Sequence, residues 1–300
     1  MACVRRAWLV LGGLSVPLED ATKGYFCSEL NLGYPEVREV VANRPDFDGV
    51  DDRTQYFGAR VVSANITAVA GAGAQIDAVA AQFAPFLRPA ARPVLHYILD
   101  RPGAPERIMT LRGSDYSWPV AGPSERDINL QWKAPDPNAY DPVQQTQTAW
   151  AGASTAPGRG YNLTFNRIYP PGGGGSTTAH FSSRGDLNAF PLFRMYGPVT
   201  GGEMRLQLSW PDTSWSLFHF AMKPTYTIDA GHWVDIDSKN HTVYRDSDRG
   251  QNLLSQVNWI WGSQWPYLAP SPAQVALWMV GSGTSGVTQI QAIWNDAFLT

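Results

Sequence analysis

The chain has 300 residues and a formal net charge of −3; 44% of its residues are hydrophobic, 16% charged and 12% aromatic. This length and apolar content allow two packed domains. The charge gives no basic footprint for nucleic acid, and no stretch approaches the roughly 20 apolar residues of a membrane span. Low charge with 12 tryptophans is typical of a surface covered by neighbouring proteins, although a carbohydrate-binding surface would also be rich in tryptophan.

The first twenty residues have the look of a signal peptide, because Arg5 and Arg6 precede an apolar run. The alternative is a first buried strand over residues 8–11, followed by a turn at Gly12 and Gly13. We expect the strand, since the apolar run is short and is broken by these glycines.

Residues 61–87 contain a predicted strand followed by a predicted helix. Apolar and polar residues alternate over 61–69, which predicts a strand with one buried face. From Ile76 to Leu87 the apolar residues recur with helical spacing, and Pro85 is expected to kink or shorten the last turn. Residues 94–99 and 108–111 flank a turn-rich loop and predict a hairpin, so the first half is mostly β with one helix.

Residues 128–142 read INLQWKAPDPNAYDP and join a strand to a proline-rich segment. Ile128, Leu130 and Trp132 share one face of the predicted strand, and the prolines that follow cannot donate a backbone hydrogen bond to a sheet. From 143 to 160 no periodicity persists. We therefore predict a first domain over 1–142, a linker over 143–160 and a second domain over 161–300.

The second half reads as short strands separated by turns. Alternation predicts strands near 161–165, 206–210, 215–219 and 290–294, and residues 233–237 and 241–244 predict a hairpin. No helical stretch of convincing length interrupts them. This pattern favours an antiparallel β-sandwich.

The sequence offers no convincing catalytic or metal-binding motif, so we expect neither enzyme activity nor a cofactor. The five histidines form no zinc motif, and the nucleophile-elbow, P-loop and dinucleotide fingerprints are missing. Residues 46–52 contain a calcium-like DxDG, but no glutamate occupies the twelfth position. Asp235 and Asp237 alternate with apolar residues and are expected to face solvent. Cys3 and Cys27 are expected to be free thiols.

Three groups of residues occur in an order and spacing that resemble a known family. They are the G-x-P-x-V-R element at 33–38, the DG-x-D-x-x-T element at 48–54 with an arginine beyond it, and the W-x-A-x-DP-x-x-Y element at 132–140. As a set they resemble the distal tail (Dit) or minor tail proteins of long-tailed, non-contractile phages, particularly phages of actinobacteria. The matching positions are Gly33, Pro35, Arg38, Asp48, Gly49, Asp51, Arg60, Trp132, Pro135, Asp136, Pro137 and Tyr140.

The resemblance implies a structural protein of the virion, at the distal end of the tail. Residues 1–142 would be a belt domain that forms a six-fold ring around the DNA channel, and 135–142 would be its stiff exit. The ring would join the tail tube protein to the tail hub and let the tape-measure protein pass. The second domain, where the resemblance is looser, would be galectin-like and hold other minor tail or receptor-binding proteins.

Two other functions fit parts of the sequence. A lectin-like receptor-binding module would stack sugars on tryptophans, with Trp210, Trp215, Trp233 and Trp261 as candidates. Galectin-like architecture alone does not imply sugar binding, because function belongs to a site and not to a fold. A cell-wall hydrolase would need a pair of catalytic carboxylates or a metal site, and the sequence has no pattern of either kind.

Overall fold

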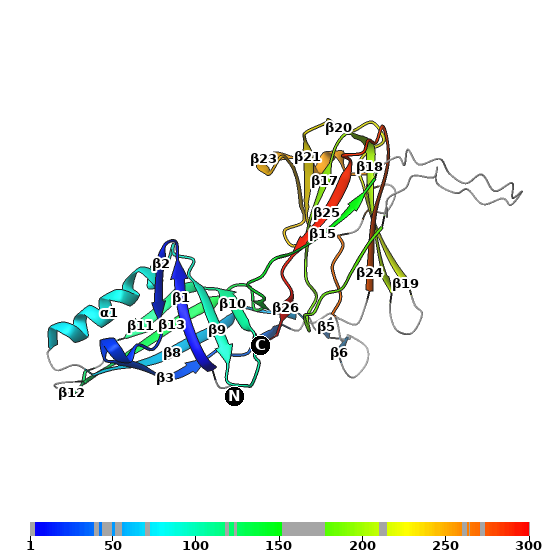
Figure 1. Ribbon diagram of the computed structural model, residues 1–300. Helices are drawn as coiled ribbons and strands as arrows, with labels where there is room; N and C mark the ends of the chain where they lie inside the picture. Colours follow the sequence, from blue (N-terminus) through cyan, green and yellow to red (C-terminus); the bar gives the residue numbers. More distant parts are fainter. Residues whose placement is uncertain are drawn as a thin grey trace, which may run out of the picture. The chain divides into compact units, whose positions relative to one another are not determined.

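The structure, a computed structural model, is mostly β with one α-helix among the residues that it describes (Figure 1). These residues are 4–38, 42–43, 50–51, 56–69, 73–117, 120–122, 125–151, 178–209, 215–259, 263, 265–270 and 274–299. The chain divides into two compact units: the first unit contains residues 1–142 and 298–300, and the second contains 143–297. The predicted fold class is confirmed.

The first sheet of the first unit has six strands in the order β2-β1-β9-β10-β14-β26. The expected first strand and the expected hairpin are both present in it, and the paired strands from β2 to β14 are antiparallel. The strands are β1 (Val4–Leu11), β2 (Leu14–Pro17), β9 (Val94–Leu99), β10 (Glu106–Thr110), β14 (Ala139–Tyr140) and β26 (Ala297–Phe298).

The second sheet of the first unit has the order β11-β13-β8-β3, with β12 also paired to β13. Its central strands alternate between a buried and a half-exposed face, as the sequence predicts for β8 and β13. The strands are β3 (Tyr25–Asn31), β8 (Arg60–Val69), β11 (Arg112–Ser117), β12 (Val120–Gly122) and β13 (Glu125–Ala134); two short ladders join β4 (Val37–Arg38) to β7 (Tyr56–Phe57) and β5 (Ala42–Asn43) to β6 (Val50–Asp51).

The helix α1 (Gly73–Leu87) closes the core of the first unit against the second sheet. Phe83 meets Tyr25 edge-on, with ring centroids 5.9 Å apart. The indole Nε1 of Trp132 donates a hydrogen bond to the carbonyl of Phe86, 3.3 Å away. Pro85 lies within the last turn, and the helix continues past it to Leu87. The apolar stripe of the sequence therefore faces the core.

The second unit contains a six-stranded sheet, β15-β25-β17-β21-β22-β23, and a five-stranded one, β16-β24-β18-β19 with β20 beside β18. The two sheets face each other: the rings of Phe181 and Trp294 lie 4.7 Å apart across them. The strands are β15 (Gln145–Trp150), β16 (Thr178–Phe181), β17 (Leu192–Tyr196), β18 (Val199–Ser209), β19 (Trp215–Ala221), β20 (Thr227–Ile228), β21 (Trp233–Asp237), β22 (Thr242–Arg245), β23 (Asp248–Asn252), β24 (Gln274–Ser282) and β25 (Gln289–Trp294).

Two of the expected boundaries differ from the structure. Within the predicted linker of 143–160, Gln145–Trp150 form β15, which pairs along its whole length with β25. Its one buried side chain is Ala149, so the strand carries little apolar signal. At the other end, residues 298–300 group with the first unit although they follow the second in sequence. The strand expected at 161–165 lies outside the described residues.

Candidate functional site

The W-x-A-x-DP-x-x-Y element carries the chain from one sheet of the first unit to the other. After Pro135 ends β13, the Asp136 carboxylate accepts hydrogen bonds from the Asn138 backbone N–H at 3.2 Å and from the Tyr140 hydroxyl at 2.7 Å. Tyr140 then pairs with Ile108 of β10. The expectation that 135–142 is a stiff extended exit is therefore wrong. The hydrogen bonds to Asp136 bend the chain around Pro137, and the chain then enters the first sheet as β14.

Gly33, the first residue of the G-x-P-x-V-R element, lies close against Arg60 and Val61 of β8. Gly33 has a φ of +63°, and a Cβ there would lie 2.1 Å from the carbonyl oxygen of Val61. Arg60 is fully buried and donates from Nη2 to the Leu299 carbonyl, while its Nε and Nη1 have no hydrogen-bond partner among the described residues. Burial lowers the pKa of Arg60.

Of the remaining motif positions, Pro35 and Trp132 have described side chains. Trp132 is fully buried and Pro35 is buried. Arg38 lies in β4 and Asp51 in β6, with only their backbones described. Asp48 and Gly49, and with them the calcium-like DxDG, lie outside the described residues.

The centre of one face of the β11-β13-β8-β3 sheet is polar and half-buried, whereas the exposed Val61 and Val69 lie on the same face at the ends of β8. We call this centre the polar sheet face. Thr67 Oγ1 donates to the Asp127 carboxylate at 3.0 Å, and Asn65 Nδ2 donates to Glu29 Oε2 at 3.3 Å. A hollow of about 210 Å³ opens on it. Its residues are Ser63, Asn65, Thr67, Asp127, Asn129 and Gln131.

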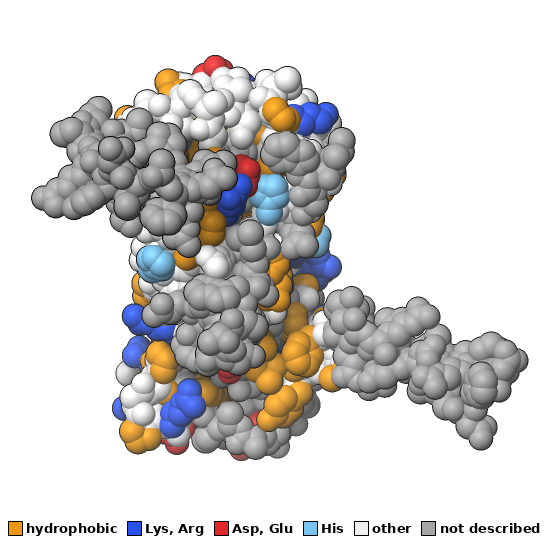
Figure 2. Space-filling view, turned by 90° about the vertical axis from the view of Figure 1, so that its right-hand side faces the viewer, with side chains coloured by type: hydrophobic (Ala, Val, Ile, Leu, Met, Phe, Trp, Pro, Cys, Tyr) orange, Lys and Arg blue, Asp and Glu red, His pale blue; other side chains and the backbone are white. Residues whose placement is uncertain are grey.

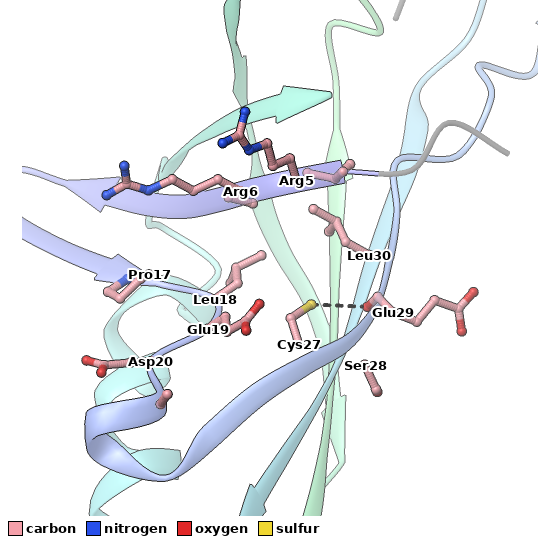
Figure 3. A pocket seen from close by; sticks show the side chains of 13 residues that line it. Arg5, Arg6, Pro17, Leu18, Glu19, Asp20, Cys27, Ser28, Glu29 and Leu30 are labelled. Atoms are coloured by element: carbon pink, nitrogen blue, oxygen red, sulfur yellow. Dashed lines mark hydrogen bonds between the residues drawn. The ribbon is translucent and has the colours of Figure 1, made fainter. Parts of the chain in front are cut away.

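A groove of about 790 Å³ separates β1 from β3 at the edge of the first unit. Figure 3 shows Leu18, Cys27 and Leu30 between these strands, with Arg5 and Arg6 on the β1 side. The Cys27 thiol is free and contacts the Glu29 carbonyl oxygen at 3.4 Å. Burial raises the pKa of Cys27 to about 11, so the thiol stays protonated at neutral pH. Cys3 lies outside the described residues.

Of the four tryptophans proposed to stack on sugars, only Trp233 has a described side chain. Trp215 has a described backbone in β19, whereas Trp210 and Trp261 lie outside the described residues. Trp233 is half-buried: the Arg194 guanidinium lies 5.2 Å from its ring centroid, and its Nε1 donates to Asp235 Oδ2 at 3.2 Å. These partners fix the indole against its own strand.

The expectation that Asp235 and Asp237 face solvent is wrong. Asp235 is fully buried and accepts from Arg194 Nε at 2.7 Å and from Ser247 Oγ at 2.9 Å. Asp237 is 9% exposed and accepts from the backbone N–H of Asn240 at 3.0 Å. Burial of both carboxylates is possible because each accepts hydrogen bonds: Asp235 from residues distant in sequence, and Asp237 from the turn that follows it.

The part of the chain that the structure describes holds no group of three or more metal-binding side chains. Among the helical segments that the structure describes, which are α1 and the 3-10 turns η1 (Ala21–Lys23) and η2 (Leu254–Gln256), none is long and apolar enough to cross a membrane. Figure 2 shows one face of the molecule, on which charged side chains of both signs are scattered among apolar ones. On that face, no continuous area of one charge is visible among the described residues.

No family model and no curated protein matches this sequence, but solved structures resemble the chain. One of them is the crystal structure of the Dit protein of phage SPP1, described as a paradigm of the hub adsorption apparatus in phages infecting Gram-positive bacteria. It aligns with 97% of this chain and 99% of its own, with a TM-score of 0.59 and a sequence identity of 13%. Two structures of the phage p2 baseplate in its activated conformation, with Ca and with Sr, each align with 97% of this chain and 98% of theirs at 10% identity; their TM-scores of 0.43 and 0.46 are too low for a conclusion about the fold. Over nearly its whole length, this chain therefore shares its fold with a phage Dit protein.

Proposed function

We propose that this chain is a structural protein of a phage tail tip, in which the first unit forms a six-fold ring around the DNA channel. The observation that carries the proposal is the shared fold with the SPP1 Dit protein, which extends over both units. The ring would join the tail tube to the tail hub in the virion. The proposal involves no catalytic step and no cofactor.

The edges of the β11-β13-β8-β3 sheet support assembly into a ring. Among the described residues, β3 and β11 each pair with another strand on one side only and lie at opposite ends of the sheet; beyond that ladder β3 has a single bridge, from Tyr25 to Asp20. Different edges can meet between successive copies in a head-to-tail contact, and such a contact closes into a ring when the rotation between copies allows it. The exposed Phe26 on β3, 44% accessible, is available for burial in that contact.

The polar sheet face supports a channel-lining role. Its six side chains are half-buried and polar, and the one carboxylate among the six, that of Asp127, already accepts a hydrogen bond from Thr67. Two further carboxylates, those of Glu29 and Asp115, lie beside it, opposite Asn65 and Gln131. The six side chains include no apolar group and no cation, so DNA and a tape-measure protein would pass over them without binding. The second unit, as a galectin-like sandwich, would hold further minor tail or receptor-binding proteins.

The test is the mass of the full chain by light scattering over a concentration series, with negative-stain imaging of the same samples. The expected result is a six-copy species that appears as a ring with a central hole. Because the tail tube can act as a template, a monomeric sample is mixed with the tube protein of the same phage and imaged again. The proposal fails if neither sample contains rings.

A further inference from the structure

A row of aromatic side chains lies on the surface of the second unit, where β19 meets the turn between β21 and β22. The imidazole of His241 stacks on the Trp265 indole, with centroids 4.9 Å apart and planes 14° apart. Trp259 stands 5.9 Å from Trp265, and both indoles rest on the fully buried Phe220. His241 is exposed and Trp259 is 45% exposed. We call His241, Trp265 and Trp259 the aromatic ridge.

The backbone on both sides of the aromatic ridge is held in place. Asp237 accepts hydrogen bonds from the backbone N–H and side-chain Nδ2 of Asn240, at 3.0 and 2.7 Å, and so fixes the turn that ends in His241. His241 itself has a φ of +53°, which a residue with a side chain rarely adopts. Trp259 Nε1 donates to the Leu254 carbonyl at 3.4 Å. The rings are therefore ordered before any ligand arrives, which lowers the entropy cost of binding.

A cleft of about 270 Å³ is connected to the ridge through the chain, since Asn240 and Thr242, the two neighbours of His241, both line it. Amide, hydroxyl and guanidinium groups supply hydrogen-bond donors and acceptors on its walls. The volume is close to the lower end of the about 300–1,000 Å³ of small-molecule sites. The other lining residues are Val243, Tyr244, Arg249 and Asn252.

We propose that the aromatic ridge and this cleft form a carbohydrate-binding site. A sugar ring has an apolar face of C–H groups, which an aromatic ring can stack on, and a rim of hydroxyls, which amide and guanidinium groups can hydrogen-bond. The site holds a sugar with its apolar face on the ridge and its hydroxyls toward the cleft. The second unit thereby binds a surface glycan. This role is separate from the ring that the proposed function assigns to the first unit.

The size of the ridge favours a sugar over a protein partner. Three aromatic side chains offer about 450–750 Å² even when wholly available, and those of the ridge are only partly exposed, whereas a stable protein interface buries about 800 Å² on each side. A ligand of one or two sugar units matches both the ridge and the cleft. The site lies apart from Trp233, the one sugar-binding candidate of the sequence whose side chain is described.

The test is an array of immobilised bacterial-surface oligosaccharides probed with the full chain, followed by calorimetry with each oligosaccharide that binds. Trp259→Ala and His241→Gly should each weaken binding about tenfold or more, because each removes one stacking ring. His241→Gly suits the test because glycine adopts the left-handed conformation without strain, so this variant should fold. Trp150→Ala is the matched control: Trp150 is 46% exposed and lies on β15, at the opposite end of the sheet from β23.

The proposal is supported if both ridge variants lose binding and the control keeps it. It is overturned if no oligosaccharide binds, if the control weakens binding as much as the ridge variants do, or if the ridge variants weaken binding to another tail protein while glycan binding is unchanged. Ring formation is measured on the same preparations. Rings without glycan binding refute this inference alone, and glycan binding without rings refutes the ring alone.

Discussion

Gly33 is the position where the structure makes the sharpest prediction about stability. Its φ of +63° lies in the left-handed region, and a Cβ built there would be 2.1 Å from the carbonyl oxygen of Val61 and 3.5 Å from Arg60 Cγ. Gly12 provides a matched comparison, because its φ is +58° but no atom lies within 4 Å of the added Cβ. The pair Gly33→Ala and Gly12→Ala separates backbone strain from steric clash.

The expected magnitudes follow from these two geometries. Alanine in the left-handed region costs about 1–2 kcal/mol, and Gly12→Ala should lower the free energy of unfolding by that amount only. At Gly33 the contact is with backbone, which no side-chain rotation can relieve, so the total loss should be about 3–5 kcal/mol. Since about 1 kcal/mol shifts the melting temperature of a unit this size by about 2–4 °C, the two variants are easily distinguished.

Hydrogen exchange in increasing urea is the suitable assay, because a chain with two units need not unfold in a single step. Peptides from β3 and β8 report on the first unit and peptides from β17 and β21 on the second. Gly33→Ala should raise exchange in β3 and β8 and leave the second unit unchanged. Equal losses in Gly33→Ala and Gly12→Ala would refute the clash, and with it the structural reason for glycine in the G-x-P-x-V-R element.

Three further predictions concern buried and titrating groups. Asp235→Ala should lower the free energy of unfolding of the second unit by about 3 kcal/mol, measured by the same exchange assay, because it removes the buried partner of Arg194; an unchanged stability would contradict the pairing. In a Cys3→Ser variant, iodoacetamide should label Cys27 slowly at pH 8 and faster as the pH approaches about 11, since the thiolate is the reactive form; rapid labelling at pH 8 would contradict its burial. Burial raises the pKa of Asp246, but hydrogen bonds from a backbone N–H of β21 and from a neighbouring imidazole outweigh it and lower the pKa below 3.8. The stability from Asp246 is therefore present above pH 3.8 and lost as the pH falls through the lower folded-state pKa; an acid titration of Asp246→Asn should lack this loss, and an unchanged titration would be evidence against it.

Elements with strict periodicity could be predicted from the sequence. Alternation over 61–69 indicates β8, and helical spacing from Ile76 to Leu87 indicates α1, because in both a continuous apolar face packs on one core. The hairpin of β9 and β10 follows from a turn between two alternating runs. Each of these patterns is local, so a single sequence contains it.

Elements that depend on distant partners could not be predicted. The sequence QTQTAW of β15 has one buried side chain, and its strand exists because β25 lies beside it. Asp235 alternates with apolar neighbours as a solvent-facing residue would, yet Arg194, 41 residues away, pairs with it in the interior. The two-residue strand β14 likewise forms only because β10 offers a place in the first sheet. No local signal encodes such pairings.

The candidate sites differ in the same way. The polar sheet face is the second half of the alternation that predicts β8 and β13, so the same residue pattern that buries Ile128 and Trp132 leaves Asn129 and Gln131 on the opposite face. The aromatic ridge has no such pattern, because His241 lies 24 residues before Trp265 and reaches it only through the turn that Asp237 fixes. A strand pattern can therefore reveal an extended polar sheet face, whereas a cluster of rings built from turns becomes visible only when the fold brings them together.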